Sequence, residues 1–180
     1  MSETQIEAHL LPILICPDPK LRKVARPVTP GDTEEVRELI SDMFATMYKA
    51  PGIGLAAPQV GRLLRVITVD VAPKDVPAPL ALINPEIIAK SEETAVQQEG
   101  CLSIPDQYAD VVRPARVKVR YLDENWVKQE IEAEGLLAAC LQHEIDHLNG
   151  VLFVDYLTPL KRNILLRKLA KAQKDMQAKR

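Results

Sequence analysis

The sequence predicts an α+β fold: a single domain over residues 1–180, with largely antiparallel strands around a central helix and a further helix at the C-terminus. Two observations predict this class. Strand-like segments cluster between the helical segments instead of alternating with them, which favours antiparallel pairing. A length of 180 residues with 27% charged and 47% hydrophobic residues fits one globular domain and excludes a disordered, collagen-like or coiled-coil chain.

The first helix is expected to begin near Asp32, which forms a capping-box pattern with Glu35, although Thr33 could equally be the cap. Apolar residues then recur at the spacing of one helix face: Val36, Leu39, Ile40, Met43, Phe44 and Met47. Pro51-Gly52 ends this helix, and the segment 52–61 is too rich in glycine and proline for a regular element.

Alternating and β-branched residues predict the strands, which end in a hairpin. The expected strands cover 64–71, 80–88, 94–98, 111–122 and 126–133, and the turn signal Asp123-Glu124-Asn125 joins the last two. A helix over 136–148 follows and is closed by Asn149-Gly150. Thr158-Pro159 opens the last helix, whose expected buried stripe is Leu160, Ile164, Leu165 and Leu169.

Composition also indicates in which part of the cell the protein acts. No run of 18 apolar residues is present, so we expect no membrane span. Glu3 and Glu7 precede the short apolar run 10–16, where a signal peptide carries positive charge, so we expect no signal peptide. An odd number of cysteines, three and far apart, favours free thiols in a reducing, bacterial-type cytoplasm.

The sharpest chemical signal is His143-Glu144-Ile145-Asp146-His147, an HExxH motif inside the predicted central helix 136–148. Histidines at i and i+4 lie one above the other on a helix face, so both rings can reach one metal ion. Glu144 then lies beside the ion, where it can take a proton from a water and deliver it to a leaving group. Because the chain has three histidines in all, a chance pair of surface or core histidines is the weaker interpretation.

A catalytic site of this kind needs a third protein ligand, and spacing alone leaves several candidates. The usual downstream positions fail, because Phe153 stands where a third histidine would fall and Glu144 is the last glutamate. The remaining candidates are His9, Cys16, Cys101, Cys140, Asp155 and Asp175. Cys140 precedes His147 on the same helix by about 10.5 Å and is better suited to a pocket wall. Cys101, in a segment flanked by glycine and proline, has a modest advantage.

Three segments taken together resemble the signature motifs of the peptide deformylase family, in the family's order. They are GIGLAAPQ over 52–59, EGCLS over 99–103 and QHEIDHLNG over 142–150. The similarity runs from about Ile13 to the final helix. It implies a hydrolase of protein biosynthesis that removes the formyl group from the N-terminal formyl-methionine of new polypeptides and releases formate. The family's usual ion is Fe²⁺, with Zn²⁺ often recovered on purification, whereas the ligand types alone do not select iron.

The resemblance also implies roles for single residues. The metal ligands would be Cys101, His143 and His147, and the general acid/base would be Glu144. The developing oxyanion would be stabilised by Gln59 and the backbone N–H of Leu102. The formyl-methionyl peptide would contact Ile53 and Gly54, and a supporting ion pair would join Glu99 to Arg113.

A methionine side chain needs an apolar slot, and helix spacing lets Leu136, Ala139 and Cys140 form its wall, although core residues would follow the same spacing. Tyr108 departs from some relatives, which carry an arginine that contacts the peptide. The pattern Gly52-x-Gly54-x-x-Ala57 matches a dinucleotide-binding fingerprint in form, but a helix precedes it and Pro58 follows, so we expect no dinucleotide.

Charge is distributed unevenly along the chain. Residues 161–180 carry a net charge of +7, and the remaining 160 residues carry −9 of the total of −2. A basic terminal helix is usually a solvated face, and the functional alternative, known for some family members, is docking on the ribosome. Two other functions stay open: a peptidase or deacylase with the same metal site, and a silent ribosome-associated module, which would have no need of Glu144.

Overall fold

The computed structural model describes residues 7–180, and within them five strands form an antiparallel sheet in the order β1-β2-β3-β6-β7. These strands are β1 (Gly54–Ala56), β2 (Val66–Val69), β3 (Leu80–Lys90), β6 (Arg116–Leu122) and β7 (Lys128–Glu134). Two further strands, β4 (Thr94–Cys101) and β5 (Ile104–Pro114), pair with each other in a separate two-stranded ribbon. Residues 1–6, including Glu3 of the signal-peptide argument, lie outside the described part.

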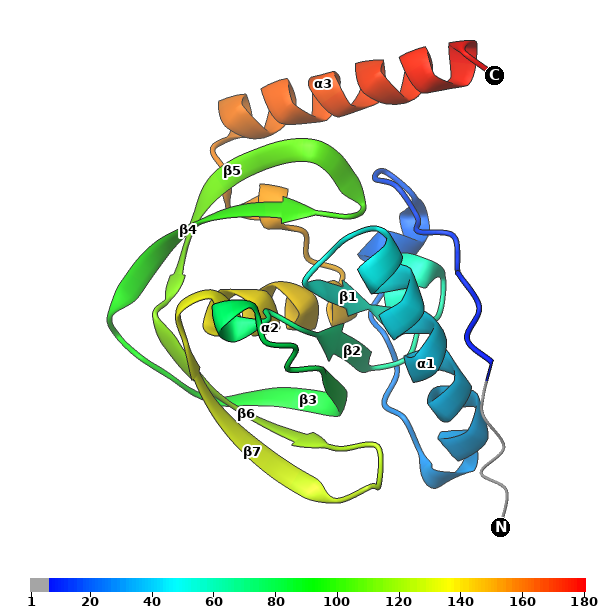
Figure 1. The fold of residues 1–180 in the computed structure, drawn as a ribbon. Coiled ribbons are helices and arrows are strands. Elements are labelled where there is room, and N and C mark those ends of the chain that lie inside the picture. Colours follow the sequence, from blue (N-terminus) through cyan, green and yellow to red (C-terminus); the bar gives the residue numbers. More distant parts are fainter. Residues whose placement is uncertain (1–6) are drawn as a thin grey trace.

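Three helices complete the architecture of residues 7–180: α1 (Thr33–Lys49), α2 (Gly135–Leu148) and α3 (Pro159–Ala178). In Figure 1, α2 lies in the middle of the molecule, between the β4–β5 ribbon and the five-stranded sheet. Its residues from Ala138 to Ile145 are all buried, so no face of this part of the helix is left to solvent. The predicted class is confirmed: antiparallel strands surround a central helix, and a further helix follows at the C-terminus.

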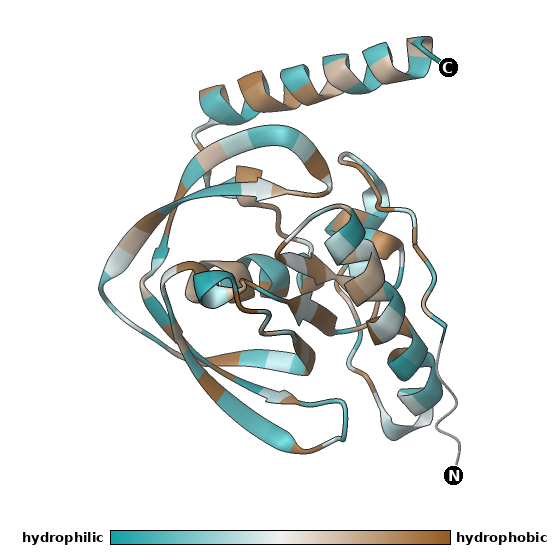
Figure 2. Cartoon of the chain, viewed as in Figure 1, coloured by the Kyte–Doolittle hydropathy of each residue, from teal (hydrophilic) through white to brown (hydrophobic). Residues whose placement is uncertain are grey.

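The core joins α1 and α2 to the five-stranded sheet. Hydrophobic residues are concentrated in β1 and β2, which lie between the two helices (Figure 2). The predicted stripe of α1 is buried apart from Phe44, which is half-buried. Because β1 and β2 are buried on both faces, they read as continuous apolar runs and not as an alternation.

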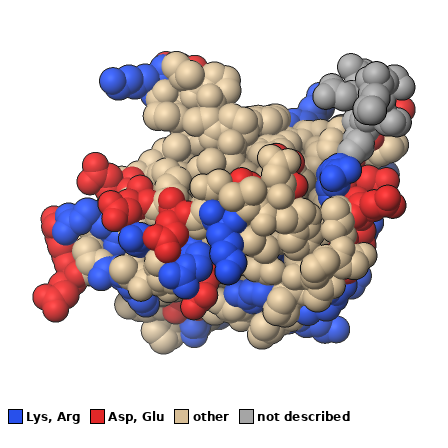
Figure 3. Space-filling view, turned by 90° about the horizontal axis from the view of Figure 1, so that it is seen from below, with Lys and Arg blue, Asp and Glu red and all other residues tan. Residues whose placement is uncertain are grey.

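The β6–β7 hairpin was predicted correctly, with Arg116 opposite Glu134 at one end and Leu122 opposite Lys128 at the other. Its exposed face carries cross-strand ion pairs, such as Lys118 to Glu130 at 3.2 Å. Acidic and basic side chains are accordingly interspersed on the face seen in Figure 3. Such exposed pairs add little stability but keep an open strand face soluble.

Two predictions about where strands lie were wrong. The segment 111–122 is not one strand, because β5 ends at Pro114 and β6 begins at Arg116 in the other sheet. Proline cannot donate a ladder hydrogen bond, so the chain changes partners there although the side-chain alternation continues. The segment 52–61, expected to be irregular, contains β1 and a 3₁₀ turn over Ala57–Val60. The strand expected over 64–71 is confirmed in its centre, Val66–Val69.

Asp32 is the N-cap residue of α1 as predicted, but its side chain makes no capping hydrogen bond to the helix. The Asp32 carboxylate accepts the backbone N–H of Thr29 at 2.8 Å and pairs with Arg26, and so it is directed away from the helix. The Thr33 hydroxyl donates to the carbonyl of Pro30 at 2.6 Å, so Thr33 is not the cap. A 3₁₀ turn over Pro30–Asp32 leads into the helix.

Helix α3 lies along β5 with a narrower contact than its sequence indicated (Figure 1). Leu165 and Leu169 are buried as predicted, but Leu160 and Ile164 are 71% and 46% exposed. The buried stripe is therefore one i, i+4 pair, with Leu166 half-buried against the same cluster, and most of the remaining helix is exposed. Within residues 7–180, no helix has both the length and the hydropathy that crossing a membrane requires.

Candidate metal centre and active site

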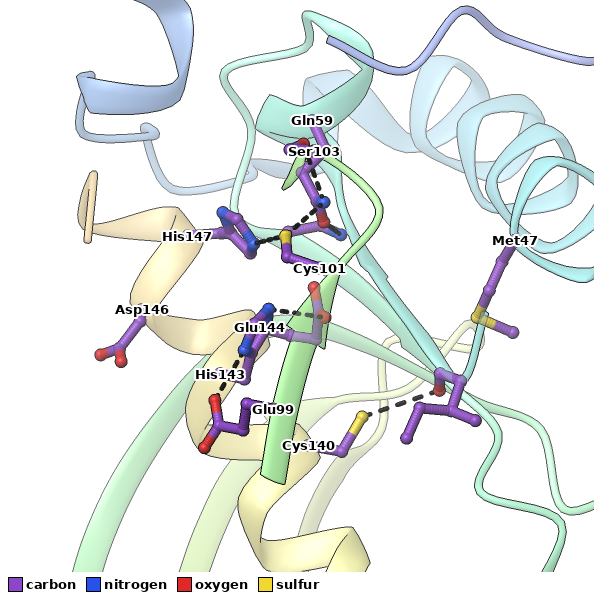
Figure 4. A network of polar contacts seen from close by, with 12 residues as sticks. Met47, Gln59, Glu99, Cys101, Ser103, Cys140, His143, Glu144, Asp146 and His147 are labelled. Atoms are coloured by element: carbon purple, nitrogen blue, oxygen red, sulfur yellow. Dashed lines mark hydrogen bonds and ion pairs between the residues drawn. The ribbon is translucent and has the colours of Figure 1, made fainter. Parts of the chain in front are cut away.

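The HExxH histidines and one distant cysteine converge at the middle of α2. His143 and His147 lie one turn apart on this buried helix, and Cys101 ends β4 beside them. One donor atom from each residue lies within 4.8 Å of the other two, and the Cys101 Sγ is 3.3 Å from the His147 Nε2. Figure 4 shows the three side chains directed toward one another. Among the described residues, this is the group that could hold a metal ion.

The other candidates for the third position lie elsewhere. His9 is exposed beside Asp42, and Asp155 is paired with Arg22 at 2.7 Å. Asp175 is on the exposed part of α3. The thiol of Cys140 donates to the carbonyl of Ile53 at 3.6 Å, so it faces the β1 side of α2. Cys16 is buried in the cluster below α3, and all three cysteines are free thiols.

A buried ion pair orients the first histidine. The Nδ1 of His143 is 2.9 Å from the Glu99 carboxylate, which leaves its Nε2 facing the centre. Arg113 holds the same carboxylate through two hydrogen bonds of 2.6 and 2.9 Å, as the family resemblance implied. Burial would raise the pKa of Glu99, but Arg113 and His143 together lower it below its ordinary value. A histidine that is bonded at one nitrogen by a carboxylate is typical of metal sites.

The ion pair extends to the surface through two residues that sequence reasoning missed. Arg113 also donates to Asp146 at 2.8 Å, and its guanidinium lies 4.6 Å from the centre of the Tyr156 ring. The Tyr156 hydroxyl donates to the same Asp146 oxygen at 2.7 Å. Asp146 lies between the two motif histidines, and this position was the signal that the sequence offered for its role. Its side chain points to the opposite side of α2.

The protonation of the two histidines fits a cation between them. Burial and then the charge of His143 lower the pKa of His147 well below its ordinary value, so its ring is neutral, as a ligand must be. Burial also lowers the pKa of His143, but its contacts with Cys101 and Glu99 outweigh this and raise it well above the ordinary value. The acidic surroundings that hold a proton on His143 would equally attract a divalent ion.

Glu144 is the buried carboxylate of the site. It is 4% exposed, and its Oε1 lies 3.9 Å from the His143 Nε2. Within residues 7–180, its Oε2 has no hydrogen-bond partner. Burial raises the pKa of Glu144 to about 7. An unpartnered carboxylate oxygen with a pKa near neutrality can accept a proton and return it at physiological pH.

Gln59 holds a fixed position on the other side of Cys101. Its Oε1 accepts the backbone N–H of Ala56 at 2.9 Å, and its Nε2 donates to the Ser103 hydroxyl at 3.1 Å and to the Cys101 Sγ at 3.4 Å. The side chain is 1% exposed. Leu102, between Cys101 and Ser103, is half-buried in the turn that joins β4 to β5.

A cleft of about 800 Å³ opens onto Leu102 and part of the metal-binding group. All five predicted substrate contacts line it: Ile53, Gly54, Leu136, Ala139 and Cys140. Glu144, His143 and Cys101 form part of its wall. Tyr108 lies at the rim with its ring against Gly100, where a Cβ would come within 2.5 Å of the ring. The metal-binding group is therefore accessible from solvent through a cleft with an apolar section.

The fold and site define a class of protein. A thiolate and two imidazoles leave a further coordination position open, which distinguishes a catalytic from a structural site. A buried carboxylate with a raised pKa and an amide donor lie beside this position. Together they define a metal-dependent hydrolase.

Comparison with known proteins identifies the family within this class. The family model for polypeptide deformylase matches residues 10–163. The peptide deformylase of Mesorhizobium japonicum is 56% identical over 165 residues, which cover 91% of this chain and 93% of that protein. The chain belongs to the polypeptide deformylase family. Members remove the N-formyl group from newly made peptides, so the predicted family, activity and enzyme class are confirmed.

Solved structures support the same assignment. The crystal structure of a peptide deformylase from Legionella pneumophila has a TM-score of 0.88 and 49% identity, covering 96% of this chain and 99% of that one. The enzyme from Ehrlichia chaffeensis in complex with actinonin has a TM-score of 0.86 and 41% identity, with 91% and 97% covered. The family is metal-dependent, and this chain has a Cys/His/His group that could hold the ion.

Proposed function

We propose that the deformylation is carried out at the Cys101–His143–His147 group, with Glu144 as the residue that moves the proton. The observation that carries this proposal is the convergence of three donor atoms within 4.8 Å beside a buried carboxylate oxygen that has no hydrogen-bond partner within residues 7–180. The proposal assigns this chemistry to one catalytic domain over 1–180.

The proposed metal is one divalent ion, with Fe²⁺ as the ion in the cell and Zn²⁺ as the ion recovered after purification. The donor set fits both, since thiolate and imidazole bind either metal well. When bound, the ion would act as a Lewis acid that polarises the formyl carbonyl and makes a nearby water more acidic. The choice of iron rests on the resemblance to the family.

Glu144 would act twice in the reaction. Its Oε2 accepts a proton from the attacking water as the water oxygen bonds to the formyl carbon. The carboxylic acid then donates this proton to the methionine nitrogen as the C–N bond breaks. A free α-amine and formic acid result, and the formic acid releases its remaining proton to solvent as it becomes formate. A carboxyl with a pKa of about 7 is suited to both steps, because neither protonation state is strongly favoured near neutral pH.

Gln59 and Leu102 would stabilise the negative charge that develops on the formyl oxygen. The Gln59 Nε2 and the Leu102 backbone N–H are neutral donors, and they favour the transition state without binding a charged ground state. The burial of Gln59 supports this role, because a donor held in a dry site reorganises less than water does when the charge appears.

The methionine side chain would occupy the part of the cleft formed by Leu136, Ala139 and Cys140, while Ile53 and Gly54 contact the peptide. Burial raises the pKa of the Cys140 thiol well above its ordinary value, so Cys140 presents a neutral, soft surface to a thioether. We also propose that this cleft binds actinonin, which is present in the Ehrlichia chaffeensis complex.

The substrate assignment is tested with freshly prepared, anaerobic, Fe²⁺-loaded protein. Formate release from a formyl-Met peptide is compared with release of acetate from the acetyl-Met peptide and with cleavage of the unblocked peptide. The proposal expects turnover of the formyl substrate alone. Faster cleavage of the acetylated or unblocked peptide would favour the deacylase or peptidase alternative.

We further propose that the protein is cytoplasmic, in keeping with its free thiols and bacterial relatives. We also propose that the basic side chains of α3 contact the ribosome. Because Leu165 and Leu169 pack on the body of the protein, truncation of α3 would disturb the fold. The test therefore replaces four exposed α3 residues by glutamine: Arg167, Lys168, Lys171 and Lys174. Cosedimentation with ribosomes at low salt should be lost, and it should be retained when four exposed lysines elsewhere are replaced: Lys23, Lys49, Lys74 and Lys128.

A further inference from the structure

Ser103 is a fully buried hydroxyl in the turn between β4 and β5, two residues from Cys101. Its Oγ accepts a hydrogen bond from the Gln59 Nε2 at 3.1 Å (Figure 4). Its backbone carbonyl accepts the N–H of Cys16 at 2.8 Å, which attaches the turn to the N-terminal segment. Only the first of these bonds uses the side chain, so the two can be separated by substitution.

The side-chain amide of Gln59 has one orientation that satisfies all its neighbours. The Ala56 N–H is a donor, so the atom facing it must be the amide oxygen. The amide nitrogen is therefore turned toward Cys101 and Ser103, and its two protons have one acceptor each. The terminal torsion of glutamine is broad, so this orientation depends on the surrounding hydrogen bonds.

The two acceptors of the amide nitrogen differ in strength. The contact with the Cys101 sulfur is 3.4 Å long, and sulfur is a weaker hydrogen-bond acceptor than a hydroxyl oxygen. During the reaction, one Gln59 proton must turn to the formyl oxygen. The bond to Ser103 at 3.1 Å is the one that can remain in place and hold the nitrogen beside Cys101.

We propose that Ser103 is a positioning residue, which acts through Gln59 by holding one amide proton so that the other can turn from the Cys101 sulfur to the reacting carbonyl. This inference rests on the proposed role of Gln59. Without the Ser103 hydroxyl, one buried N–H loses its acceptor, and the amide rotates to recover a partner. The donor is then misplaced in the transition state, while substrate binding in the apolar part of the cleft is unaffected.

The kinetic test is a double-mutant cycle between Ser103→Ala and Gln59→Leu. Ser103→Ala should lower kcat by about tenfold, the equivalent of one neutral hydrogen bond, with KM changed less than about twofold. Gln59→Leu should lower kcat by about 10²–10³-fold. In the Gln59→Leu background, Ser103→Ala should cause no further loss, because the residue through which it acts has gone.

A matched control separates positioning from stability. Thr68→Val also deletes a fully buried hydroxyl, but Thr68 is in β2 and contacts the Met47 sulfur, away from the site. Urea unfolding measures the stability of every variant, and the control should lose stability without losing kcat. Equal losses of kcat for Ser103→Ala in both backgrounds would overturn the inference, since its role would then be independent of Gln59.

A second readout does not depend on turnover. In the Zn²⁺-loaded, ¹⁵N-labelled protein, the Gln59 side-chain amide signals are assigned by their disappearance in Gln59→Leu. Ser103→Ala should accelerate the hydrogen exchange of these protons and shift one of the pair, whereas Thr68→Val should leave both unchanged. Unchanged exchange in Ser103→Ala would overturn the inference. Full activity of Gln59→Leu would instead overturn the proposed role of Gln59, and the exchange measurement would still decide whether Ser103 holds the amide.

Discussion

Replacement of Gly54 by alanine should displace the carboxylate of Glu144, the proposed proton carrier, without disturbing the metal-binding group. A Cβ at this position would lie 2.8 Å from both the Glu144 Oε1 and the Cys140 Sγ, and 2.9 Å from the Glu144 Cγ. Ordinary van der Waals contact begins near 3.4 Å. The Glu144 side chain must therefore move by roughly 0.5–1 Å, and its Cγ is too close to the buried helix to move freely.

The size of the effect follows from this displacement. A misplacement of about 1 Å costs about 10²-fold in rate, so kcat should fall by about 30- to 100-fold. Gly54 is in a strand with negative φ, so the alanine backbone is unstrained, and the overpacking should cost about 1–3 kcal/mol of stability. Metal content should stay at the wild-type level, because the three atoms nearest to the Cβ belong to Cys140 and Glu144 and not to a metal-donor side chain.

The assay is formate release at saturating formyl-Met peptide, with metal content measured on the same samples. Gly31→Ala is the matched control, because the nearest atom to its Cβ is the Thr29 hydroxyl at 3.8 Å. This variant should keep wild-type kcat. Full kcat in Gly54→Ala at equal metal content would refute the reasoning that the position of Glu144 limits the reaction.

Three further predictions concern pH, metal affinity and packing. Burial raises the pKa of Glu144 from 4.5 to about 7, so the unfolding free energy of the metal-free protein falls as pH rises through this interval. In urea titrations, Glu144→Gln should be more stable than wild type by about 3 kcal/mol at pH 8 and equal to it at pH 4.5. A difference that is the same at both pH values would contradict this. Glu99→Gln removes the charge that orients His143 and should weaken Zn²⁺ binding by about 10–100-fold in chelator competition. An unchanged affinity would count against the role of the Glu99–His143 pair. Leu169→Ala should cost about 2–4 kcal/mol and Leu160→Ala less than about 0.5 kcal/mol, because only the first is buried; similar costs would show that α3 packs differently in solution.

The parts of the fold that follow from periodicity were predictable from sequence. The stripe of α1, the β6–β7 hairpin and the two later helices depend on local spacing, and spacing is visible in one chain. The division between β5 and β6 was not predictable in this way. Residues on both sides of Pro114 keep the same alternation, and spacing does not show that β5 pairs with β4 whereas β6 pairs with β3 and β7 in the other sheet. The same limit applies to β1, whose partner β2 is set by tertiary contacts.

The candidate site was predictable where one helix or one motif contained it. His143, Glu144 and His147 follow from helix geometry, but spacing could not choose among six possible third ligands. Cys101 reaches the histidines through the end of β4, which depends on how the ribbon packs over α2. The hydroxyl of Ser103 and the carboxylate of Asp146 were missed because their partners, Gln59 and Arg113, come from distant segments.

The turnover of Glu144→Gln is the most direct test of the account as a whole. The variant keeps the size of the side chain and removes its ability to carry a proton, so Cys101, His143 and His147 should bind metal as in wild type. Formate release by the anaerobic, Fe²⁺-loaded variant should be about 10²–10⁴-fold slower than by wild type at equal metal content. A rate within about threefold of wild type would contradict the assignment of Glu144 as the proton carrier.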